Sequence, residues 1–153
     1  MNDNILKAFD LLAKDILDLF KQVLESDVGV NRKVGKNTLK DSRLAKTATV
    51  VSDAPFVHLI VNDYIDFIES GCNRRTYAPE IWELRDWAKR KGIPSDNSTL
   101  RAIQYAIWRD GIMGRPIMKT FYKLLDKKLD TDYQEILYEE IIQNLIKYFN
   151  GND

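Results

Sequence analysis

The chain has 153 residues, 44% of them hydrophobic, and its 23 basic and 23 acidic side chains leave no formal net charge. This length fits one domain with a modest core, and the neutral balance argues against a dedicated nucleic-acid binder, which usually has a clear basic excess. One cysteine excludes an internal disulfide. The lack of a signal peptide or of a run of about 20 apolar residues predicts a soluble protein made inside a cell, with no membrane partner.

Residues 3–25 carry the clearest helical pattern. Apolar side chains recur at spacings of three and four, from Ile5 through Phe9 to Val23, which predicts an amphipathic helix. Its apolar stripe is wide. The stripe therefore needs a partner surface, either within the fold or on a neighbouring subunit.

A polar segment follows at residues 28–46. It holds two glycines, two asparagines and six basic side chains, a composition that predicts a mobile basic loop. Thr38 or Asp41 can start a short helical turn inside it.

Residues 47–71 allow two interpretations. One is a single helix from Pro55 to Ser70. The other pairs Thr47–Val51 with Phe56–Val61 as a β-hairpin, followed by a short helix that ends at Gly71. Periodicity alone does not separate the two, and we favour the hairpin because both runs are rich in β-branched residues.

Two short helices are predicted at residues 79–92 and 97–110, and together they form a helical insertion at 79–111. The first has a proline in its first turn and ends at Gly92, and the second ends at Gly111. Proline is tolerated at helix starts and glycine favours helix ends, so both boundaries follow from local chemistry.

The C-terminal part contains an apolar–basic segment at residues 117–129 and an amphipathic helix at Tyr133–Phe149, with the pattern broken at Asp130–Asp132. We therefore predict a single α+β domain over residues 1–153. It has a long N-terminal helix packed on a small antiparallel sheet, two inserted helices and a C-terminal helix. An all-α fold is the alternative if residues 54–70 form one helix.

The charges alternate in blocks along the chain. Residues 31–52 hold six basic and one acidic side chain, a balance of +5, and residues 74–119 hold ten and five, also +5. The blocks 1–30, 53–73 and 120–153 are negative, at −3, −4 and −3. Such a mosaic is either an ordinary set of solvated faces or a set of patches through which one copy meets the next.

Residue types suited to catalysis are scarce. His58 is the only histidine and has apolar neighbours on both sides, and Cys72 has no second thiol for a CxxC site. No phosphate-binding, dinucleotide-binding or nucleophile-elbow motif occurs. We therefore predict no enzyme activity and no catalytic, metal or cofactor site.

The two inserted helices suggest an alternative function. Two short helices around a turn, within a block of charge +5, are similar to a helix-turn-helix, and Arg101, Gln104 and Arg109 could reach base edges. Against this, the connecting segment is long for that motif, and both helices contain tryptophans better suited to packing. A DNA-binding regulator that uses residues 79–110 is therefore the second hypothesis.

Short motifs also carry a family resemblance. They are a basic segment at Lys36–Arg43, a Tyr-x-x-(Phe/Tyr)-(Ile/Val)-Glu-x-Gly element at Tyr64–Gly71, and an Arg-Pro-(Ile/Phe)-(Leu/Met) element at Arg115–Met118. Together they resemble the tail-completion proteins of tailed phages, which form neck rings in head–tail connectors. A composition rich in lysine, asparagine and isoleucine is compatible with the ring proteins of crAss-like phages. Longer members insert two helices, with matches here at Trp87–Gly92 and Ala106–Gly111. The resemblance spans roughly residues 1–148, although the family's usual Gly-Arg-Arg is interrupted here by Cys72 and an asparagine.

The resemblance implies a structural virion protein, made in the host cytoplasm and located in the virion neck. Copies would form a ring of six or twelve that joins the portal or adaptor to the tail or to further ring proteins, with DNA only as passing cargo. Candidate assembly contacts are apolar residues of the first helix, basic residues of the loop and on either side of the insertion, and two tryptophans: Phe9, Ile16, Phe20, Lys33, Lys36, Lys40, Arg43, Arg74, Arg75, Trp82, Trp108 and Arg115.

Overall fold

The computed structural model describes residues 3–28, 38–53 and 55–150. They fall into two compact units: unit 1 lies within residues 1–65 and 117–153, and unit 2 is Asp66–Pro116. The long N-terminal helix, the small antiparallel sheet and the further helices are all present, which confirms the predicted α+β class. The predicted helical insertion lies inside unit 2.

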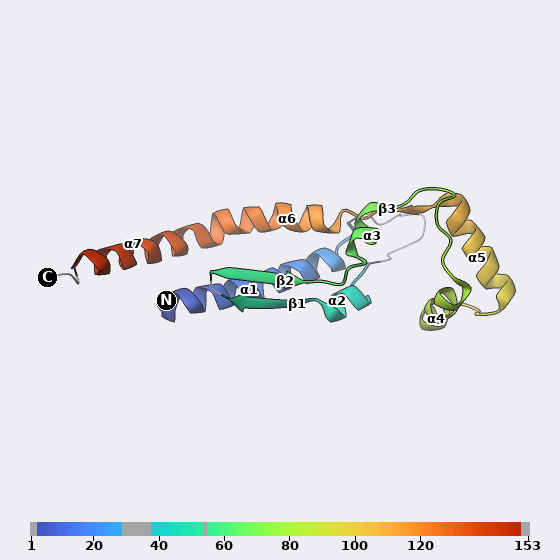
Figure 1. The fold of residues 1–153 in the computed structure, drawn as a ribbon, viewed down its shortest axis with the longest axis horizontal. Coiled ribbons are helices and arrows are strands. Elements are labelled where there is room, and N and C mark those ends of the chain that lie inside the picture. The colour runs from blue at the N-terminus through green and yellow to red at the C-terminus, as the bar shows by residue number, and fades with distance from the viewer. Residues whose placement is uncertain (1–2, 29–37, 54, 151–153) are drawn as a thin grey trace. The chain divides into compact units, whose positions relative to one another are not determined.

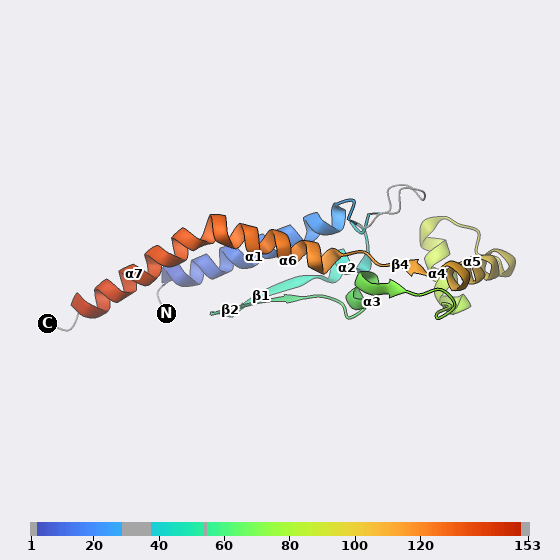
Figure 2. The ribbon, with the colours of Figure 1, turned by 90° about the horizontal axis from the view of Figure 1, so that it is seen from above.

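Unit 1 is organised around helix α1 (Asp3–Glu25), whose bounds match the prediction. A hairpin of β1 (Thr49–Asp53) and β2 (Phe56–Ile60) packs on α1, and so does α6 (Ile117–Lys128). Figures 1 and 2 show α6 running alongside α1, with the hairpin also lying along that helix. The wide apolar stripe of α1 thus finds its partners within the chain.

The core of unit 1 lies where α1 meets α6. Phe20 is fully buried, and its ring meets that of Phe121 edge-on, with the centroids 5.6 Å apart. Aromatic pairs favour this arrangement because a positive ring edge faces a negative ring face. The other buried side chains of the unit are almost all aliphatic: Ala13, Ile16, Val23, Leu24, Leu44, Ala48, Ile65, Ile117 and Tyr133.

The hairpin interpretation of residues 47–61 is confirmed. β1 and β2 are antiparallel, and Val51 lies opposite His58 in their register. Side chains alternate between half-buried and exposed along both strands. The half-buried set, Val50, Ser52, Val57 and Leu59, forms the inner face that packs on α1.

Part of the predicted mobile loop at 28–46 lies outside the described residues, which omit 29–37. Where the chain is described again, the Leu39 N–H donates to the Leu24 carbonyl at 2.9 Å, next to the end of α1. Helix α2 (Arg43–Thr47) follows. The expected start at Thr38 or Asp41 is wrong: the hydroxyl of Ser42 accepts the backbone N–H three residues on and therefore caps the helix.

The predicted break at Asp130–Asp132 is also wrong. α6 continues through a π-helical turn, η2 (Leu129–Tyr133), into α7 (Gln134–Asn150), as Figure 1 shows. The hydroxyl of Thr131 donates to the Lys127 carbonyl at 3.0 Å, back along the helix. Polar side chains that usually end a helix here bond to the helix itself, and the extra residue is absorbed as a wider turn.

Tyr133 is buried against α1 at the end of this π turn. Its hydroxyl donates to the Asp15 carboxylate at 2.6 Å, and the Lys128 ammonium lies 3.4 Å from the same carboxylate. Burial, together with the hydrogen bond to Asp15, raises the pKa of Tyr133 far above its ordinary value of 10.0. The folded protein therefore keeps this phenol protonated in alkaline solution.

Unit 2 contains α4 (Ile81–Lys91) and α5 (Asn97–Asp110), which pack on one another. Leu84, Ala88 and Leu100 are buried between them, with four isoleucines packed around this cluster. α4 begins after Glu80, whose capping box with Glu83 places the start two residues later than predicted. α5 is capped by Asp96, because the Asp96 carboxylate accepts from both the N–H and the hydroxyl of Thr99.

A two-stranded ribbon pairs the segment before α4 with the segment after α5. β3 (Gly71–Cys72) pairs with β4 (Ile112–Met113), and backbone hydrogen bonds from Arg75 to Trp108 and from Arg115 to Ile68 flank the pair. The predicted helix end at Gly71 is correct, since α3 (Ile65–Ser70) stops there. The ribbon itself was not predicted, because two residues are too few to show a strand pattern.

Glycines make this close approach of two backbones possible. A Cβ added to Gly71 would collide with the backbone of β4, and one added to Gly111 or Gly114 would collide with the backbone of the opposite segment. Gly71 and Gly111 also have positive φ values of 66° and 72°, which side chains disfavour. These glycines therefore fix where the chain enters and leaves the helix pair.

We predict that Gly71→Ala destabilises unit 2 much more than Gly92→Ala. The two glycines share the same φ, 66° and 67°, but an added Cβ meets nothing within 4 Å at Gly92. Gly92→Ala should therefore lower the free energy of unfolding by about 1–2 kcal/mol, the strain of a side chain in the left-handed region. Gly71→Ala should lower it by about 1–3 kcal/mol more, because its Cβ also overpacks the site. Equal losses in the two variants would contradict the close backbone approach.

The measurement is urea unfolding followed by tryptophan fluorescence, because all three tryptophans lie in unit 2. Circular dichroism of the same samples is dominated by the long helices of unit 1. Coincident transitions in wild-type protein would support the predicted single domain, and separate transitions would contradict it.

We also predict that Tyr133→Phe lowers the free energy of unfolding by about 1 kcal/mol at pH 7, because Asp15 loses a hydrogen-bond donor. Above pH 10 the unfolded tyrosine ionises while the folded one stays neutral, so wild-type protein loses stability as pH rises. The variant lacks this group, and its deficit should shrink between pH 8 and pH 11 in urea titrations. A deficit that stays constant with pH would show that the raised pKa does not contribute.

Candidate assembly surfaces

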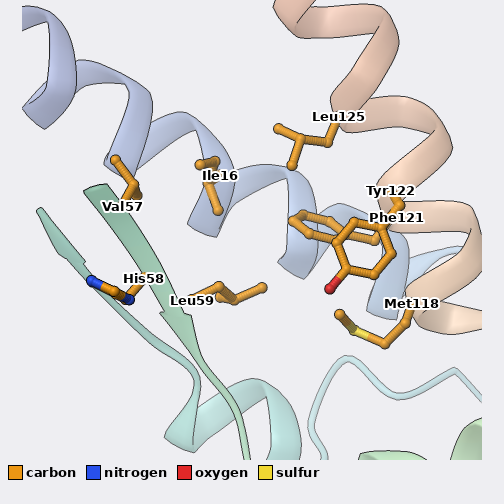
Figure 3. Close-up of a pocket in the computed structure, with 8 residues that line it drawn as sticks. All are labelled: Ile16, Val57, His58, Leu59, Met118, Phe121, Tyr122 and Leu125. Atoms are coloured by element: carbon orange, nitrogen blue, oxygen red, sulfur yellow. The ribbon is translucent and has the colours of Figure 1, made fainter. Parts of the chain in front are cut away.

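A cavity of about 300 Å³ lies in unit 1 between α1, β2 and α6. Figure 3 shows Leu59 pointing from β2 toward the aromatic side chains of α6, whereas His58 points the other way. The lining is mainly apolar: Ile16, Val57, His58, Leu59, Met118, Phe121, Tyr122 and Leu125. This lining is suited to packing rather than to chemistry, because it brings no acid, base and nucleophile together.

The described side chains that are suited to catalysis or metal binding do not form a cluster. In the part of the chain that the structure describes, no three His, Cys, Asp or Glu side chains are grouped so as to hold a metal ion. His58 lies beside Phe56 on the exposed side of the hairpin, with ring centroids 6.2 Å apart, and Cys72 is half-buried in β3. No described helix is long and apolar enough to cross a membrane.

The exposed side of the hairpin, which we call the hairpin face, is apolar. Phe56 is 62% exposed, and Val51 and Ile60 are also exposed. The register places these three side chains on the same side as Thr49, Asp53 and His58. A two-stranded hairpin with one face on α1 thus presents a second apolar face to solvent, and such faces mark interaction sites.

A second apolar surface runs along α7. Tyr138, Ile142, Leu145 and Phe149 are spaced by four, three and four residues, which aligns them on one side of the helix, the α7 stripe. Tyr138 is 64% exposed, Leu145 and Phe149 are exposed, and Ile142 is half-buried. Figures 1 and 2 show α7 continuing past the start of α1, so that the far part of the helix projects from the core of unit 1.

Unit 2 carries its own exposed aromatic side chains. Trp82 is exposed on α4, and Tyr105 and Trp108 are exposed on α5 with their rings 5.8 Å apart. On α3, Phe67 meets Tyr77 edge-on at 5.4 Å. Tryptophan and tyrosine are enriched at protein interfaces because a large apolar ring carries a polar group.

The three assembly contacts predicted on α1 are buried or half-buried within the subunit. Ile16 and Phe20 are buried in the core of unit 1, so they hold the subunit's own fold together in this structure, and Phe9 is half-buried. Burial against α6 accounts for this, because the stripe of α1 faces a partner in the same chain. Trp82 and Trp108 are exposed, as an intermolecular contact requires.

The basic contacts are distributed over both units. Lys40 lies 3.6 Å from Glu25, and Arg43 is exposed on α2. In unit 2, Arg74 and Arg75 are exposed and Arg115 is half-buried. The remaining two predicted contacts, Lys33 and Lys36, lie outside the described residues.

The residues proposed to read DNA are largely engaged within the chain. The Gln104 amide donates to the Pro79 carbonyl at 2.8 Å, and Arg109 makes two hydrogen bonds to Asp110, at 2.8 and 2.6 Å. Arg101 is exposed. On the exposed side of α5 stand Tyr105 and Trp108, four and seven residues after Arg101.

Comparison of the chain with models of protein families, with curated proteins and with solved structures found no match.

Sequence reasoning did not identify the hairpin face or the α7 stripe as surfaces. The signal for the first is present in β2, where Phe56, His58 and Ile60 alternate with Val57 and Leu59. Apolar residues at nearly every position indicate a strand buried on both faces. One of these faces is covered by α1, and the other has no cover among the residues of unit 1 that the structure describes.

We predict that Val50→Thr and Val51→Thr have different effects, although they are neighbours in β1. Threonine matches valine in shape, so the change tests burial of a hydroxyl. Val50 faces α1, so its substitution should lower the free energy of unfolding by about 1–3 kcal/mol. Val51 is exposed, so its substitution should lower that free energy by about 0.5 kcal/mol or less. Urea unfolding at low protein concentration measures both, and a larger loss at Val51 would reverse the assignment of the two faces.

Proposed function

We propose that this protein is a structural virion component that forms a ring in the head–tail connector of a tailed phage. The observation that carries the proposal is the pair of exposed apolar surfaces on unit 1, the hairpin face and the α7 stripe. Exposed apolar surface of this kind favours association with other protein surfaces. The sequence motifs at Tyr64–Gly71 and Arg115–Met118 supply the resemblance to phage neck proteins.

The two surfaces differ in structure, and that difference supports ring formation. One is a β-ribbon and the other is a helix, so a contact between them joins unlike surfaces of two copies. Contacts of this heterologous type repeat from copy to copy and form a ring when the rotation closes. We propose six or twelve copies, joined to the portal or adaptor and to the tail or further ring proteins.

The charge distribution fits a ring around a DNA channel. The chain is neutral overall, with blocks of +5 and of −3 or −4. A channel subunit has to let DNA pass without gripping it, and a neutral chain is better suited to this than a basic one. The blocks of opposite sign can pair between copies, which predicts that association weakens as salt increases.

The test is direct imaging together with a mass measurement. Purified protein at increasing concentration should show ring-sized species by light scattering, with fewer at high salt. Connector subunits can stay monomeric until they dock, so the protein is also mixed with portal-containing capsids and imaged. Failure to form rings alone, combined with failure to bind any virion component, would overturn the proposal.

The same preparation tests the alternative, a DNA-binding regulator. Titration with duplex DNA at 50 and 200 mM salt should show no tight binding if the protein is a connector subunit. A groove-binding protein would instead lose affinity steeply between these two concentrations. Loss of that binding in Arg101→Ala would favour the regulator.

A further inference from the structure

We infer that the α7 stripe of one copy packs across the hairpin face of the next copy. The inference gives the subunit contact for the proposed function and relies on that function only for closure into a ring. Both surfaces belong to unit 1, and both are exposed and apolar.

The two surfaces match in size. From Tyr138 to Phe149 the α7 stripe is about 16 Å long, at 1.5 Å per residue. Five-residue strands such as β1 and β2 extend over roughly 13–17 Å, and two strands about 4.8 Å apart form a ribbon about 10 Å wide with their side chains. An α-helix with its side chains is also about 10 Å wide. One helix can therefore cover the hairpin face, and little of either surface remains exposed.

The charges at the two ends set the direction of the helix. Beside the first residue of β1, helix α2 carries exposed Arg43 and Lys46, whereas Asp53 lies at the tip of the hairpin. On α7, exposed Glu135 lies three residues before Tyr138, on the same side of the helix as the α7 stripe, and exposed Glu139 lies beside it. Glu135 faces opposite charge only if α7 begins over the α2 end and finishes over the tip, because the reverse direction would place it over Asp53.

The same chain cannot supply both partners. The inner face of the hairpin packs on α1, so the hairpin face points away from that helix. α7 is continuous with α6, which also packs on α1 and holds α7 on the helical side of the unit (Figures 1 and 2). To reach its own hairpin face, α7 would have to leave α6 and cross to the opposite side. A second copy is therefore the occupant that provides the matching length, apolar character and charge.

Disulfide trapping tests the contact and its direction. In a Cys72→Ser background, chains with Ile60→Cys are mixed with longer, tagged chains that carry Tyr138→Cys, and the mixture is oxidised mildly. Ile60 is opposite the first residue of β1, at the α2 end, so the proposed direction brings these two positions together. A disulfide needs Cα atoms within about 7 Å, and we expect a mixed dimer on a non-reducing gel.

The matched control replaces Tyr138→Cys with Phe149→Cys, at the other end of the same stripe. In the proposed direction this position lies about 16 Å further along α7, so the yield of mixed dimer should fall at least fivefold. The reverse preference would overturn the proposed direction. Equal, low yields for both pairs would overturn the contact itself.

Charge reversal gives an independent test that leaves the core unchanged. Glu135→Lys and Lys46→Glu should each weaken self-association about threefold to fivefold at low salt, as expected for an exposed ion pair. The double variant should return to within about twofold of wild type, because the pair is restored with its signs exchanged. Analytical ultracentrifugation measures the affinities, and additive losses in the double variant would contradict the pairing. Circular dichroism confirms that each variant is folded.

The outcomes separate this inference from the proposed function. Rings that form without the disulfide from Ile60→Cys to Tyr138→Cys would leave the ring function in place and overturn the contact. If the disulfide forms but light scattering shows only dimers, the contact stands as a reciprocal exchange between two copies. In that case ring closure fails.

Discussion

Helix α1 has to bury its apolar stripe, and the rest of unit 1 is arranged to meet that requirement. Phe20, near the C-terminal end of α1, is covered by Phe121 of α6, and the hairpin lies on the same helix. A two-stranded hairpin is marginal on its own in water, so β1 and β2 depend on α1 for a surface to pack on. The C-terminal helix is held through Tyr133 and Asp15, which again ties it to α1. Loss of α1 would therefore remove the surface on which the hairpin, α6 and α7 pack.

The sequence predicted the elements much better than it predicted their surroundings. Apolar spacing and helix-ending glycines predicted the bounds of α1, α4 and α5 to within two residues, because those signals are local. The continuity from α6 to α7 was missed, since Asp130–Asp132 are helix breakers by composition and only the structure shows the Thr131 hydroxyl bonded back to the helix. Which surfaces remain exposed was also beyond local signals. Ile16 and Phe20 were expected at an interface, yet burial depends on where α6 lies, and spacing does not specify that.

Unit 1 combines a small core with large exposed apolar surfaces, so its stability and its association are thermodynamically linked. A partner that covers the hairpin face or the α7 stripe binds only the folded chain and stabilises it by mass action. Unit 2 has a separate cluster around Leu84 and Leu100 and is joined to the chain through the paired β3 and β4. Its exposed aromatic side chains give it the character of an interaction module as well. The two units thus offer separate surfaces to different partners.

The π-helical turn between α6 and α7 has a consequence for how this surface can change in evolution. Each residue of an α-helix rotates the next by about 100°, whereas the π turn at Leu129–Tyr133 takes up one extra residue in a wider turn, so the residues after it keep their facing. Deletion of one codon in this turn would regularise the helix and leave the α7 stripe facing nearly the same way, whereas deletion of one codon in the regular part of α7 would turn every later side chain by about 100°. A lineage could therefore gain or lose the extra residue without changing which neighbour the helix contacts, while the core around Phe20 and Phe121 stays the same.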